Sequence, residues 1–89
     1  MKEIEWVQES PIEARAEVPD PIEPSRFNRF ILSVISNRDG RMAPWSVWGN
    51  RRGVNVSDSI SVAKGTNARI YAMDRATRVL RAILGVDES

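Results

Sequence analysis

The chain has 89 residues, of which 42% are hydrophobic and 28% are charged. This length allows one small domain that buries only ~60% of its unfolded surface, and the composition excludes wholesale disorder. The absence of cysteine excludes disulfides and thiolate metal sites, so packing must stabilise the fold. No stretch reaches the ~20 apolar residues of a membrane span, and the start lacks the apolar core of a signal peptide. We therefore expect no membrane contact and a cytoplasmic location.

Charge is divided unevenly along the chain, although the net charge is only +1. Residues 1–25 contain seven acidic and two basic side chains, whereas residues 26–89 contain eleven basic and five acidic ones. Ten of those eleven are arginines, whose planar guanidinium suits phosphate and carboxylate groups. The division predicts an acidic arm, 1–25, and a basic α+β domain, 26–89, whose partner is nucleic acid or an acidic protein surface.

Residues 1–25 also hold four of the five prolines. Proline lacks a backbone donor and pushes its predecessor towards extended geometry, so we expect an extended arm outside helices and sheet interiors. Ile4 and Trp6 alternate with glutamates and would anchor this arm as an edge strand, on the domain or on another chain. A homo-oligomer formed through the arm is left open, and so is a disordered tail.

Three strands are expected after residue 27. Residues 30–36 are rich in β-branched side chains and are followed by Asp39-Gly40, a strong hairpin signal. Residues 42–48 form the second run, in which Pro44 must lie at an edge, a bulge or an unpaired position. The third strand covers residues 54–57, and its resumption at 60–62 is left open.

A helix is expected over residues 66–84, where apolar residues recur at three- and four-residue steps. Thr66 would cap its start and Gly85 its end. The sequence therefore predicts a small α+β fold, a three-stranded antiparallel meander with one C-terminal amphipathic helix packed on it. A helix-turn-helix that begins near Ser57 is the competing interpretation, which the β-branched residues between 54 and 62 disfavour.

Three short runs are locally similar to plant-type AP2 DNA-binding domains. They are Pro-Trp-Ser-Val-Trp at 44–48, Gly-Val-Asn-Val at 53–56 and Ala-Met-Asp-Arg-Ala at 72–76. The family's spacing between its second and third strands is absent. The resemblance implies three strands plus a helix, with arginine and tryptophan of the sheet facing the major groove.

Trp45 and Trp48 are three residues apart, so on a regular strand they point to opposite faces. If the helix covers one face, one tryptophan enters the core and the other is exposed. An exposed tryptophan can stack on a base or anchor a protein interface. The competing interpretation places both in the core or beneath the arm.

Arginines flank the two predicted turns and form a stripe on the predicted helix. Those of the turns lie at opposite ends of the second strand, ~20 Å apart at ~3.4 Å per residue, enough to meet phosphates on both sides of a groove. Solvation alone also explains charged residues in turns and on helix faces. The candidate residues for binding nucleic acid or a partner are Arg38, Arg41, Trp45, Trp48, Arg51, Arg52, Arg75 and Arg78.

Catalysis receives little support, because the chain has neither histidine nor cysteine and its carboxylates show no paired spacing. We expect no enzyme, no metal and no cofactor. The first hypothesis is a nucleic-acid-binding module, in which arginine-rich turns contact the backbone and a tryptophan stacks. The second is a protein-interaction module, such as a viral or mobile-element inhibitor, adaptor or assembly protein, which binds through its arm and a tryptophan anchor.

Overall fold

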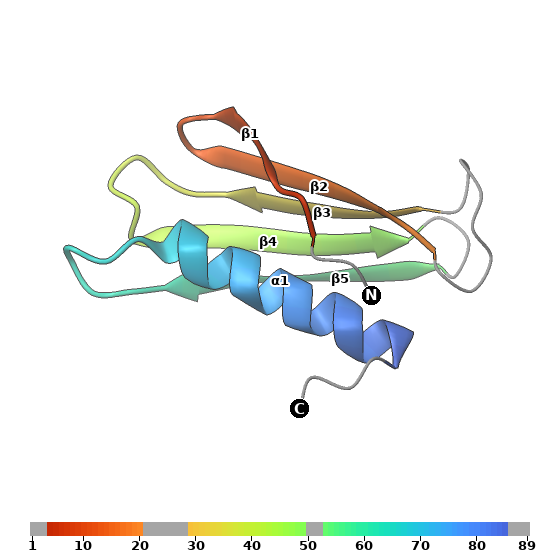
Figure 1. Cartoon of the computed structure of the whole chain (residues 1–89). Helices are drawn as coiled ribbons and strands as arrows, with labels where there is room; N and C mark the ends of the chain where they lie inside the picture. Colours follow the sequence, from red (N-terminus) through yellow and green to blue (C-terminus); the bar gives the residue numbers. More distant parts are fainter. Residues whose placement is uncertain (1–3, 21–28, 50–52, 86–89) are drawn as a thin grey trace.

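The computed structural model describes residues 4–20, 29–49 and 53–85. These residues form one antiparallel sheet with a helix packed against one of its faces (Figure 1). Strands that are neighbours in the sheet are also neighbours in sequence, so the sheet is a meander. The elements are β1 (Val7–Ser10), β2 (Glu13–Pro19), β3 (Arg29–Ile35), β4 (Met42–Gly49), β5 (Val54–Ser61) and α1 (Ala68–Leu84).

The predicted α+β class, with one C-terminal helix on an antiparallel sheet, is confirmed, but the predicted number of strands is wrong. The described residues form a sheet of five strands rather than three. The two additional strands come from the predicted arm, and β2 pairs with β3 over all seven of its residues. The prolines permit this pairing because Pro11 lies in the turn between β1 and β2 and Pro19 is the last residue of β2.

The N-terminal segment also contributes to the core. Ala14 and Ala16 of β2 are buried, and Ile4 and Trp6 are partly buried against the core of their own chain. Residues 4–20 are therefore part of the folded body, and the prediction of a separate arm is wrong for them.

The turn between β3 and β4 is the one that Asp39-Gly40 predicts. The side-chain oxygen of Asn37 accepts hydrogen bonds from the backbone N–H groups of Arg41 and Met42, at 3.0 and 3.1 Å. Gly40 has a φ of +73°, which glycine adopts without the steric cost of a Cβ. The turn fixes the register of β3 against β4.

β5 is one uninterrupted strand, so the two short runs expected there are parts of the same element. Pro44 lies in β4 and pairs with Ser59 of β5. The pairing of β4 with β3 reaches only to Trp45, the residue that follows Pro44. The missing N–H of Pro44 is therefore not needed for the ladder to β3.

The N-cap of the helix lies one residue later than predicted, and α1 begins at Ala68. Asn67, rather than Thr66, is the N-cap, and its side chain accepts a hydrogen bond from the N–H of Arg69 at 3.0 Å. Gly85 ends the helix in the left-handed conformation, as the sequence predicts, and its N–H donates to the carbonyl of Ala82.

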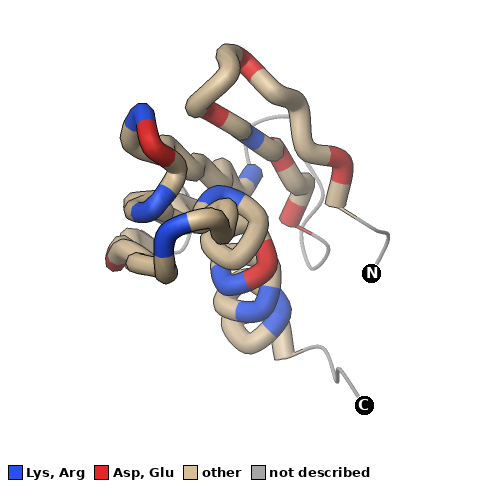
Figure 2. Tube along the Cα trace, turned by 90° about the vertical axis from the view of Figure 1, so that its left-hand side faces the viewer, with Lys and Arg blue, Asp and Glu red and all other residues tan. Residues whose placement is uncertain are grey.

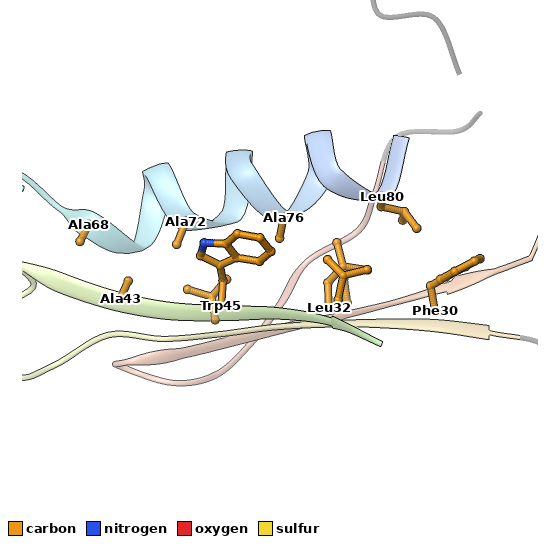
Figure 3. Packing of buried hydrophobic residues seen from close by; sticks show 11 residues of the cluster. Phe30, Leu32, Ala43, Trp45, Ala68, Ala72, Ala76 and Leu80 are labelled. Atoms are coloured by element: carbon orange, nitrogen blue, oxygen red, sulfur yellow. The ribbon is translucent and has the colours of Figure 1, made fainter. Parts of the chain in front are cut away.

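The core lies between α1 and the sheet (Figure 3). The helix faces the sheet with Ala68, Ala72, Ala76 and Leu80, which recur every four residues and are fully buried. The indole of Trp45 lies beneath Ala72 and Ala76 and is only 5% exposed. Because alanine is small, these positions leave room for the large ring between the helix and β4.

Candidate interaction surface

The sheet face turned away from α1 is covered by no element of the described chain (Figure 1). Side chains alternate along a strand, so every second residue of β2 to β5 points to this face. Pairing across the strands arranges these residues in two continuous rows and in a third that is interrupted between Ile35 and Pro44, because the pairing of β3 with β4 ends at Trp45. The hydroxyl row is Arg15, Ser33, Ser46 and Ser57; the tryptophan row is Glu17, Ile31, Trp48 and Asn55; the proline row is Glu13, Ile35, Pro44 and Ser59. We call the three rows together the open face.

The hydroxyl row forms a trough between the other two. One hollow of about 420 Å³ lies where the hydroxyl and tryptophan rows adjoin, and one of about 430 Å³ lies where the hydroxyl and proline rows adjoin. Both hollows are lined by Ser33 and Ser46, so the small serine side chains form part of the wall of each. The larger side chains of the flanking rows form the walls of this trough.

Large apolar side chains are exposed on this side of the sheet. Trp48 and Ile35 are each 44% exposed, and Met42, at the start of β4, is 46% exposed. Their neighbours on the other side of the same strands are almost fully buried beneath α1. Exposed apolar side chains on a sheet face are typical of surfaces that bind another molecule, and Ile70 and Tyr71 are a further exposed pair on α1.

The β2 end of the open face is charged. The carboxylate of Glu17 forms two ion pairs, from Oε1 to Nη2 of Arg15 at 3.6 Å and from Oε2 to Nε of Arg29 at 3.5 Å. The side chains of Glu17 and Arg15 are about half exposed. Arg15 belongs to the hydroxyl row and Glu17 to the tryptophan row. The two rows therefore end in opposite charges.

The uneven division of charge along the sequence is also a division in space. Figure 2 shows acidic residues along the β1–β2 hairpin and basic residues along α1 and the turns beside it. The acidic part is nevertheless one edge of the sheet, not a loose leader that could move away from the basic part.

The structure does not bring the predicted site residues together. Trp48 lies on the open face, whereas Trp45 is buried under α1 and is removed from the candidate surface. Arg38 and Arg41 lie at the β3–β4 turn. Arg75 and Arg78 are exposed on α1, on the opposite side of the sheet from Trp48, and Arg51 and Arg52 lie outside the described residues.

Most residues of the open face were not predicted from the sequence. Ile31, Ser33 and Ser46 alternate with buried residues along β3 and β4, and that period of two was available in the sequence. Arg15 and Glu17 were missed because their segment was assigned to the arm. The rows themselves depend on the register between strands, which the sequence does not specify.

Within residues 4–20, 29–49 and 53–85, no group of three or more carboxylates could hold a metal ion. None of the helices in this part of the chain is long and apolar enough to cross a membrane. Comparisons of the chain with protein-family models, with curated proteins and with solved structures find no match. The local similarity to AP2 domains therefore gains no support, and the surface itself must guide the functional argument.

Proposed function

We propose that this chain is a non-enzymatic protein-interaction module and that the open face is its docking surface. The observation that carries the proposal is the exposure of Trp48 and Ile35 on a sheet face that no described element covers. Interface centres are rich in aromatic residues, with polar residues at the rim. The open face supplies one such aromatic residue, Trp48, and its apolar side chains lie on both sides of the serines of the hydroxyl row.

This proposal changes the binding surface that the sequence suggested. The sequence hypothesis used the N-terminal arm to hold a partner, but Ile4 and Trp6 pack on the core of their own chain. The exposed tryptophan keeps its proposed role as an anchor, and the sheet around it replaces the arm.

The test is capture of proteins by the tagged chain from an extract of the cells that make it, with nuclease present. We expect a protein to be captured, and the substitution Trp48→Glu to abolish capture by placing a charge at the centre of the surface. The matched control is Tyr71→Glu, because Tyr71 is an aromatic residue of α1 that is 54% exposed. Capture that depends on nucleic acid, or that survives Trp48→Glu, contradicts the proposal.

A second candidate function is nucleic-acid binding through the basic side of the molecule. The observation that favours it is the gathering of basic residues along α1 and the adjoining turns. Arg78 is partly neutralised by Asp74, at 3.0 Å, but both side chains are exposed and such pairs are weak. Electrostatic binding of this kind must fall steeply with salt.

The two candidates use opposite faces, so paired variants separate them. Anisotropy of labelled single- and double-stranded DNA at low and moderate salt would measure the second. Arg75→Glu combined with Arg78→Glu should abolish this binding and leave protein capture unchanged, and Trp48→Glu should do the reverse. Binding that does not change with salt would eliminate the nucleic-acid candidate.

A further inference from the structure

Two neighbouring rows of the open face are complementary in charge and in size. Within β2 to β5, the hydroxyl row is basic at β2 and otherwise small, and the tryptophan row is acidic at β2 and bulky in β3 and β4. In these strands, the hydroxyl row begins with the basic Arg15 and continues with small serines, and the exposed Val7 of β1 pairs with Arg15 at its edge. The tryptophan row, two residues away along each strand, begins with the acidic Glu17 and continues with the bulky Ile31 and Trp48. A surface of this kind is complementary to a copy of itself if each row meets the other row of the copy.

We propose that the open face binds a second copy of this chain about a twofold axis between these two rows. The axis lies parallel to the sheet and perpendicular to its strands, so β2 lies over β2 of the copy and β4 over β4. The inference rests on the proposed function, because it names the partner of the same surface. The result is a two-sheet sandwich in the aligned packing class, with both helices outside.

Charge complementarity supports this arrangement at the β2 end. The rotation places Arg15 opposite the partner's Glu17 and, by symmetry, Glu17 opposite the partner's Arg15. Within one copy each of these side chains is still about half exposed, so it can accept a further ion pair. In the next rows, the rotation places Glu13 opposite the partner's Pro19 and Ile35 opposite the partner's Arg29.

Complementarity of size supports it at the centre. The rotation places Trp48 over the partner's Ser46 and Ile31 over the partner's Ser33. The trough along the hydroxyl row is the hollow that such side chains would fill, and filling it removes their exposed apolar area from water. At the β5 end, Asn55 meets the partner's Ser57, and both are polar.

The area of the face sets the expected strength of the dimer. The four strands β2 to β5, ~4.8 Å apart and about seven residues long, give a projected area of about 450 Å² per copy, or about 900 Å² in total. This is just below the ~1,000 Å² of a specific interface. We therefore expect a dimer that dissociates on dilution.

The test is sedimentation equilibrium of the full chain from low micromolar to near-millimolar concentration. Wild type should dimerise. Arg15→Glu and Glu17→Arg should each raise the dissociation constant about tenfold or more, because each sets like charges opposite each other at two symmetric places. Arg75→Glu, the same change of charge on α1, should have no effect. Far-UV circular dichroism checks that every variant is folded.

Mixing the two single variants gives the sharpest result. In the mixed dimer, the new carboxylate at position 15 faces the new guanidinium at position 17, and across the axis Glu17 faces Arg15. We expect the equimolar mixture to recover dimerisation that neither variant shows alone. A monomeric wild type, or a mixture as weak as the separate variants, would overturn this proposal. If the chain is monomeric but captures another protein, and Trp48→Glu abolishes that capture, the proposed function still stands. If no protein is captured either, the proposed function and the proposed dimer are both wrong.

Discussion

The two tryptophans of β4 lie three residues apart but have different surroundings. Trp45 is 5% exposed beneath the alanines of α1, whereas Trp48 is 44% exposed on the open face. Trp45→Ala should leave a large cavity and lower the free energy of unfolding by about 3–5 kcal/mol. Trp48→Ala should cost less than about 1 kcal/mol, because an exposed side chain is lost. Urea denaturation at low protein concentration measures both, and equal losses would contradict the placement of the two rings.

Gly49 ends β4 directly against the ring of Phe30. A Cβ at position 49 would lie 2.7 Å from Cε1 and 2.8 Å from Cδ1 of Phe30, and the ring is almost fully buried. Gly49→Ala should therefore destabilise the fold by about 1–3 kcal/mol through overpacking. In a Phe30→Leu background the same change should cost less, because the ring atoms are gone. A double-mutant cycle from denaturation curves measures this coupling, and additive effects would exclude the clash.

At the scale of elements, the contribution of β1 and β2 to the sheet determines whether residues 26–89 can fold on their own. β2 pairs with β3 over its whole length and buries two alanines. Removing residues 1–19 would expose the edge of β3 and part of the core, so we expect the fragment to lose its cooperative thermal transition. Circular dichroism of the fragment during heating checks this. A fragment that melts cooperatively near the temperature of the full chain would restore the prediction of an arm.

The elements after residue 28 could be predicted because their local signals agree with the tertiary structure. The β-branched residues of 30–36 and the Asp39-Gly40 turn indicate β3 and its hairpin with β4, and the helical spacing with Gly85 indicates α1 and its end. β2 was missed because proline was taken to exclude the interior of a sheet, and the edge strand expected around Ile4 and Trp6 lies just before β1. The structure places Pro11 in a turn and Pro19 at the end of a strand, and local propensity alone does not distinguish these positions from interior ones.

At the scale of the whole molecule, the candidate surface depends on long-range pairing. That Trp45 and Trp48 lie on opposite faces follows from the period of a strand, but which of them is covered depends on the face that α1 packs against. The meeting of Arg15 with Ser33, and of Ser33 with Ser46, depends on the register of three strands. The sequence therefore indicated one exposed tryptophan but not the row of serines beside it.

At this scale the sheet has two different faces: a helix covers one, and we propose that a second copy binds the other. Amide chemical shifts of the full chain, followed by NMR as concentration rises, test this claim directly. We predict shifts that change at Ser33, Ser46 and Trp48 and stay constant along the exposed side of α1, at Arg75 and Arg78. Shifts that change on α1 while the open face stays constant, or that do not change at all, would contradict it.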